Sequence, residues 1–143
     1  MGISDLIHDR VERYRDRNFL KAAMAASALT AFADGSVSVS ERFKVEQILE
    51  RLERLRIYDV QKAVEKFEAY VSELEDNTEA AEMVLLGKLK RMAADREAAD
   101  LIARIAIEIS YADTYFNRAE RMQFEAICGA LDLEAKSYTE ESR

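Results

Sequence analysis

The chain has 143 residues, of which 49% are hydrophobic and 34% charged, a composition typical of one folded domain rather than a disordered segment. Its net charge of −7 disfavours binding to nucleic acid, which would require a segregated basic face. The single cysteine excludes an intramolecular disulfide and a multi-cysteine zinc site, and the absence of proline favours uninterrupted helices.

Apolar residues recur with helical periodicity along nearly the whole chain, and no segment alternates with the period of a strand. We therefore predict an all-α fold: a compact bundle of about seven helices in a single domain spanning residues 1–143. The core is expected at about 18–132, and the polar tail at 134–143 is expected to fray. In chain order, helices are expected at about 4–15, 19–33, 39–55 and 59–74, then from about 78, from about 96, and at about 118–131.

Polar residues that can act as N-caps precede several of these helices. Asn18 is the expected cap of the second helix, Asn77 or Thr78 begins the fifth, and Asp95 caps the sixth. The second and sixth helices are apolar on nearly all sides, which is typical of helices at the centre of a bundle. No signal peptide or membrane-spanning stretch is expected, so the predicted location is the cytoplasm.

A ten-residue pattern at the end of the second helix recurs 79 residues later, at the end of the sixth. The first copy spans residues 33–42 and the second 112–121. Four positions are identical (Ala, Asp, Glu and Arg), and the apolar Val37 corresponds to Phe116. Because the identities fall at equivalent junctions between helices, we predict an internal duplication that divides the bundle into two pseudo-repeated halves.

Most residues of the repeated pattern can be explained by the need to end one helix and begin another. Ser38 and Glu41 have the spacing of a capping box, in which each side chain binds the other residue's amide, and Asn117 and Glu120 repeat this spacing. Gly35 suits the left-handed position that closes a helix. These residues therefore have an architectural role whether or not they have another.

The aspartates are not explained in this way. Asp34 and Asp113 are predicted in the last turn of an apolar helix, where the helix dipole disfavours a carboxylate by about 0.3–1 kcal/mol. A cation bound by Asp34 and Glu41, with Ser38 as a further oxygen ligand, would reverse this penalty, and Asp113 and Glu120 repeat the pair. The sequence leaves open whether the turns only cap helices or also bind a cation, and whether there is one joint site or two.

Other titratable residues suggest no catalytic constellation. His8 is the only histidine, and Cys128 lies in an apolar pattern where a buried thiol is expected. Further acidic residues alternate with Lys and Arg and are expected to form a solvated face. This series consists of Glu50, Glu53, Glu65, Glu68, Glu73 and Glu75.

The arrangement Ala-Asp-Gly-x-apolar-x-x-x-Glu after an Ala-rich helix resembles the tellurite-resistance protein TerB family. The residues that carry the resemblance most specifically are Ala33, Asp34, Gly35, Val37 and Glu41, with Asp113, Phe116 and Glu120 in the second half. The resemblance covers about residues 18–132 and implies a helical bundle of two related halves, with a divalent cation such as calcium held by the acidic turns. Thr114 replaces Gly35 in the second turn, so that turn is expected to follow a different backbone path.

The resemblance also implies a role in a bacterial stress response such as tellurite resistance, with partner proteins near the inner membrane. We therefore expect a non-enzymatic module that binds calcium or magnesium and other stress-response proteins, without inserting into the membrane; self-association is left open. The alternative is a metal-free scaffold whose acidic turns are only helix caps. A hydrolase with paired carboxylates is a third class, disfavoured because no nucleophile or acid–base pair emerges.

Overall fold

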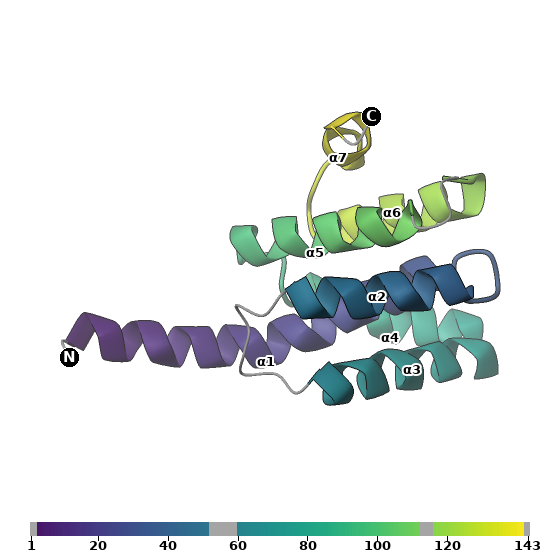
Figure 1. The fold of residues 1–143 in the computed structure, drawn as a ribbon. Coiled ribbons are helices and arrows are strands. Elements are labelled where there is room, and N and C mark those ends of the chain that lie inside the picture. Colours follow the sequence, from purple (N-terminus) through teal and green to yellow (C-terminus); the bar gives the residue numbers. More distant parts are fainter. Residues whose placement is uncertain (1–2, 52–59, 112–115, 142–143) are drawn as a thin grey trace.

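The computed structural model describes residues 3–51, 60–111 and 116–141, with side chains from residue 17 to residue 139 of these segments. These segments form helices and short connections without any strand, which confirms the predicted all-α class (Figure 1). The helices are α1 (Ile3–Ala31), α2 (Val39–Arg51), α3 (Val60–Asp76), α4 (Thr78–Lys90), α5 (Arg96–Ser110), α6 (Arg118–Ala130) and α7 (Ala135–Glu141).

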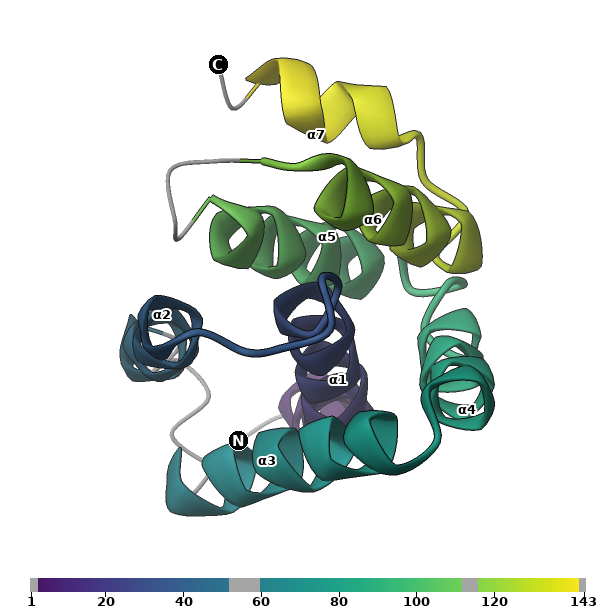
Figure 2. The ribbon, with the colours of Figure 1, turned by 90° about the vertical axis from the view of Figure 1, so that its right-hand side faces the viewer.

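The C-terminal half of α1 is the centre of the bundle, and its N-terminal part extends beyond the other helices (Figure 1). Six alanines of this half are buried, so neighbouring helices can approach closely on several sides. Helices α3, α4, α5 and α6 all contact α1, and Figure 2, which looks nearly along it, shows them around it. These alanines of α1 are Ala22, Ala23, Ala25, Ala26, Ala28 and Ala31. Ala33, just beyond the helix, is half-buried, and the neighbouring helices α4 and α5 contribute the buried Ala81 and Ala99.

The separate helices expected at 4–15 and 19–33 are instead one continuous helix, so the prediction that Asn18 is an N-cap is wrong. No proline or glycine occurs between Ile3 and Ala31, so nothing in the local sequence ends the ladder of backbone hydrogen bonds. An asparagine inside a helix costs less than about 1 kcal/mol, which the burial of the following apolar turns readily offsets.

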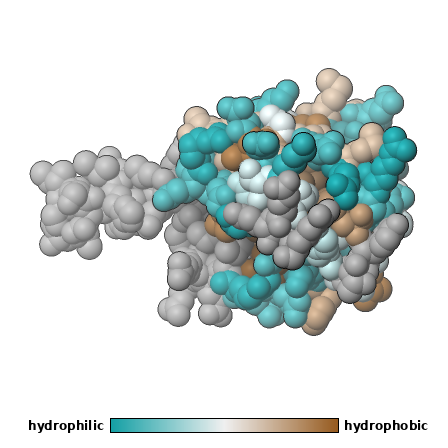
Figure 3. All heavy atoms as spheres, turned by 90° about the horizontal axis from the view of Figure 1, so that it is seen from above, coloured by the Kyte–Doolittle hydropathy of each residue, from teal (hydrophilic) through white to brown (hydrophobic). Residues whose placement is uncertain are grey.

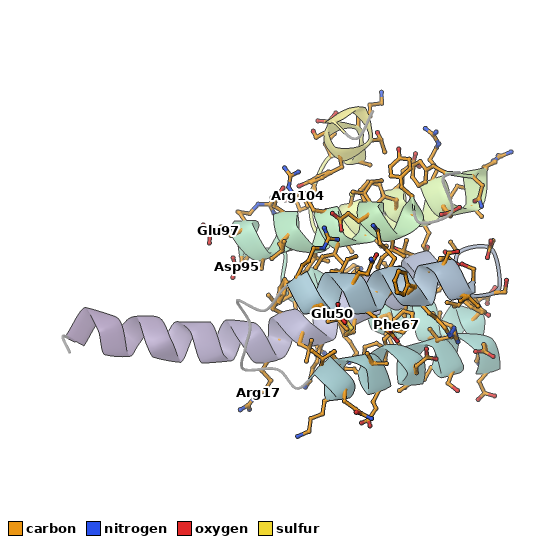
Figure 4. The ribbon with its side chains drawn as sticks, viewed as in Figure 1. Arg17, Glu50, Phe67, Asp95, Glu97 and Arg104 are labelled. Carbon is orange, nitrogen blue, oxygen red and sulfur yellow. The ribbon has the colours of Figure 1, made fainter. Side chains whose placement is uncertain are left out.

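The predicted caps of α4 and α5 are confirmed. Asn77, rather than Thr78, caps α4, because its side-chain oxygen accepts the amide of Ala80 at 3.3 Å. Asp95 accepts the amide of Ala98 at 3.2 Å and stands at the start of α5 (Figure 4). Helix α5 buries most of its apolar residues against α1, and these two helices form the middle of the fold, as predicted.

The polar tail at 134–143 contains a helix, α7, so the prediction that it frays is wrong for the part of it that the structure describes. The buried Tyr138 fixes α7 to the body: its hydroxyl donates to Asp100 Oδ1 at 2.6 Å, and its ring meets that of Phe124 edge-on at 6.1 Å. Arg104 lies over the same ring and binds Asp100 Oδ2 at 3.0 Å. A single aromatic residue therefore orders a segment of otherwise polar composition.

We expect Tyr138→Phe to lower the free energy of unfolding by about 1 kcal/mol at neutral pH. The Tyr138 hydroxyl, and to a lesser extent Arg104, holds the pKa of Asp100 below its usual value. The pKa of Asp100 is therefore lower in the folded state than its unfolded-state value of about 3.9. The stability that the ionised Asp100 contributes is complete above the unfolded-state pKa and is lost as pH falls through the folded-state pKa. Urea unfolding at pH 7 and pH 2 measures the free energy of unfolding of the wild type and the variant. The difference between the two proteins should be smaller at pH 2, and a difference independent of pH would contradict this account.

Candidate functional site

The first repeated junction closes α1 and leads into α2. The amide of Gly35 donates to the Phe32 carbonyl at 2.8 Å, and Gly35 has a φ of +96°, which confirms its predicted left-handed conformation. Helix α1 ends at Ala31, so Asp34 lies beyond the helix and not in its last turn as predicted. There Asp34 is exposed, and its Oδ1 accepts the amide of Ser36 at 3.3 Å, an Asx turn that stabilises the loop.

The start of α2 has the predicted capping box. Ser38 Oγ accepts the amide of Glu41 at 3.0 Å, and Glu41 Oε1 accepts the amide of Ser38 at 2.9 Å. The side chain of Glu41 is therefore folded back over the first turn of α2 rather than extended into solvent. Only 4% of Glu41 is exposed, an unusual value for a glutamate.

The start of α6 repeats the same device. Asn117 Oδ1 accepts the amide of Glu120 at 2.8 Å, and Glu120 Oε1 accepts the amide of Asn117 at 3.4 Å. Glu120 is 6% exposed. Asp113, the remaining predicted ligand, and Thr114, at which the second turn was expected to diverge, lie outside the described residues.

Phe116 anchors the second junction immediately before its cap. Its ring centroid lies 5.2 Å from that of Tyr111 and 6.4 Å from that of Phe124. The guanidinium of Arg121 lies 5.3 Å from the centre of the Phe116 ring. The apolar residue before the cap is thus packed on both sides, and the equivalent Val37 also packs against the core.

Glu41 and Glu120 are the only buried charged side chains among the described residues; Ser27, Thr30 and Ser110 are the buried neutral polar ones. A carboxylate removed from water requires compensating partners. Each glutamate lies in the first turn of a helix, where backbone amides and the positive end of the helix dipole supply part of that compensation.

The two glutamates also have equivalent places in the fold. The C-terminal ends of α1 and α5, and with them the N-terminal ends of α2 and α6, lie at the same end of the molecule (Figures 1 and 2). Helix α2 contacts α5, and helix α6 contacts α1, so each capped helix packs against the central helix of the other half. This reciprocal packing is the arrangement expected of two related halves.

The first junction offers oxygen donors only: the carboxylates of Asp34 and Glu41 and the hydroxyl of Ser38. Thr30, in the last turn of α1, has a buried hydroxyl with no hydrogen-bond partner. Within 3–51, 60–111 and 116–141, no three His, Cys, Asp or Glu side chains group so as to hold a metal ion. The donor chemistry suits calcium or magnesium, whose shell would be completed by carbonyl or water oxygens, and not zinc or copper.

Cys128 has the buried, inert environment predicted for it. Burial, and secondarily the charge of Glu125, raises the pKa of its thiol to about 12, so the thiol stays protonated at neutral pH. Because the thiolate is the reactive form, we expect no reaction of the folded protein with Ellman's reagent and rapid reaction of one thiol in concentrated guanidinium chloride. Stoichiometric labelling of the folded protein within minutes would contradict this placement.

Comparisons with known proteins identify the same family that the residues of the junctions resemble. A family model described as tellurite resistance protein TerB matches residues 20–141, which include α7. A curated relative named tellurium resistance protein TerB, from an Alcaligenes species, is 26% identical over 98 residues, which are 68% of this chain and 80% of the relative. No solved structure matches the chain.

Proposed function

Because the chain belongs to the tellurite resistance protein TerB family, we propose that it is a non-enzymatic module of a tellurite-resistance-related stress response whose acidic junctions bind a divalent cation. The observation that carries this proposal is the pair of buried glutamates, Glu41 and Glu120, at equivalent helix starts. We place its action in the cytoplasm, with other stress-response proteins as partners at the inner membrane surface. None of the described helices is long and apolar enough to cross a membrane.

Asp34 and Glu41 would hold the ion at the first junction, with Ser38 as a further oxygen donor; Asp113 and Glu120 are the corresponding pair at the second. Calcium or magnesium, when bound, supplies positive charge between oxygen ligands. Glu41 is fixed to the first turn of α2 and Asp34 to the turn that ends α1, so drawing them together fixes the angle between these helices. Helix α2 contacts α3 and α5, and its angle determines the surface offered to a partner.

A metal-free scaffold is the second candidate, and the completeness of both capping boxes favours it. Each box satisfies two backbone amides without an ion. Cation binding requires the charge of each glutamate, whereas a metal-free scaffold requires only its capping hydrogen bond. Glutamine at the same position can make the same capping hydrogen bond but has no charge, so Glu41→Gln and Glu120→Gln remove the charge while keeping the cap.

Growth on tellurite tests the proposed function. In a strain lacking its own copy, we expect the wild-type chain to restore resistance and the double variant Glu41→Gln/Glu120→Gln to fail, although it folds. The matched control is Glu125→Gln/Glu134→Gln, which changes the net charge equally at two exposed positions and should restore resistance fully. Full resistance with both double variants would leave the metal-free scaffold as the function.

A further inference from the structure

Helices α2 and α3 contact each other and run in opposite directions in the view of Figure 1. Arg42 of α2 pairs with Glu68 of α3 at 3.2 Å near one end. A surface groove between the two helices is lined by Glu46, Glu50, Val60, Gln61, Val64 and Glu65. Figure 4 shows Glu50 on α2, near α3.

Large apolar side chains are exposed on α2 and at the start of α3. Val39 and Phe43 of α2 are 84% and 59% exposed, and Val60 at the start of α3 is also exposed. Val39, Phe43, Glu46 and Glu50 follow one another at helical spacing and so form one stripe along α2. Val39, Phe43 and Val60 are three of the seven exposed large hydrophobic residues in the described segments. The face seen in Figure 3 carries hydrophilic residues with hydrophobic ones among them.

The charge of the groove is not compensated within the described part of the chain. Two carboxylates outside the groove have cationic partners, Glu108 with Arg51 and Asp100 with Arg104. Glu46, Glu50 and Glu65 make no such ion pair with another described residue. Three like charges in one groove repel one another, and basic groups of a partner would relieve this repulsion.

We propose that this α2–α3 surface binds a basic amphipathic helix of a partner protein. The apolar side of that helix would cover Val39, Phe43 and Val60, and its Lys and Arg side chains would reach the three groove glutamates. The stripe from Val39 to Glu50 is about 17 Å long, which matches about three turns of a docked helix. The net charge of −7 disfavours a second copy of this acidic chain as the occupant and speeds association with a basic one. None of the residues of this surface is one of the proposed cation ligands.

A labelled synthetic peptide tests the proposal by fluorescence anisotropy. The probe is a helix of about 14 residues with leucines on one face and lysines on the other. We expect it to bind the wild type, and Glu46→Gln/Glu50→Gln/Glu65→Gln to raise Kd by about tenfold or more and to weaken its dependence on salt. Phe43→Ser should raise Kd several-fold with the salt dependence unchanged, because it removes only apolar contact.

The control Glu82→Gln/Glu125→Gln/Glu134→Gln makes the same change of net charge on α4, α6 and the segment before α7, and its Kd should equal that of the wild type. Circular dichroism verifies that each variant is folded. The proposal is overturned by a wild type that does not bind the peptide, by equal Kd values for the wild type and the groove variant, or by an equal loss in the control. It is also overturned if sedimentation shows a dimer of this chain that the groove variant abolishes.

Discussion

Phe124→Ala is expected to lower the free energy of unfolding by about 3–5 kcal/mol, the largest effect of any single substitution considered for this chain. Phe124 is almost completely buried in α6, so its truncation removes a large apolar surface and leaves a cavity. Its ring also makes edge contacts with Phe116 of the second junction and with Tyr138 of α7. The substitution should therefore loosen both the junction and the C-terminal helix.

The exposed Met122, two residues earlier on the same helix, provides the matched control. Met122→Ala removes a flexible side chain without opening a cavity and should change stability by less than about 0.5 kcal/mol. Urea unfolding followed by circular dichroism measures both variants. A loss below about 1 kcal/mol for Phe124→Ala, or an equal loss for Met122→Ala, would show that α6 is not packed as described.

The double variant Glu41→Ala/Glu120→Ala should lower the free energy of unfolding by about 2–4 kcal/mol in the presence of a chelator. Each substitution removes the side chain that accepts the cap residue's amide, together with the favourable charge at a helix N-terminus. The corresponding glutamine double variant should lose less than half as much, because glutamine retains the capping hydrogen bond.

Chemical denaturation in the presence of chelator gives the free energy of unfolding of the wild type and of both double variants. The comparison distinguishes the stability contributed by the capping hydrogen bond from that contributed by the carboxylate charge. If glutamine costs as much stability as alanine, the carboxylate charge rather than the capping hydrogen bond fixes the junctions. If even the alanine variant stays within about 1 kcal/mol of the wild type, the capping boxes contribute little to the fold.

The junctions could be predicted from the sequence because their interactions are local. A capping box joins residues three positions apart, and a left-handed glycine is required wherever a helix closes in this way, so Ser38, Glu41 and Gly35 were recognisable without tertiary information. The burial of the C-terminal half of α1 was equally visible, because apolar residues occur on nearly all of its faces. Helix α5 differs, because Glu97, Leu101, Arg104 and Glu108 form an exposed face. The resemblance to the TerB family was visible in the same local pattern, and the family model matches residues 20–141.

Features that depend on distant contacts were not predictable in this way. The order of α7 depends on Tyr138 meeting Asp100 and Phe124, and nothing near Tyr138 in the polar tail indicates these partners. Asn18 is a good capping residue and so indicates a helix start, but the absence of any helix breaker lets α1 continue through it.

The α2–α3 groove could not be predicted from the sequence for the same reason. Glu50 and Glu65 were expected on a solvated face, and both are exposed. Only the packing of α2 against α3 places them in one groove beside Val60. No spacing along the chain connects residues of two different helices.

Isothermal titration of calcium and magnesium into the chelator-treated protein tests the cation proposal most directly. The comparison is with Asp34→Asn/Glu41→Gln, which retains the side-chain oxygens for the Ser36 and Ser38 amides but removes both charges. Cation binding at the first junction predicts saturable heat for the wild type that is lost or strongly reduced in the variant. Negligible heat from the wild type, or identical isotherms for the two proteins, would contradict it.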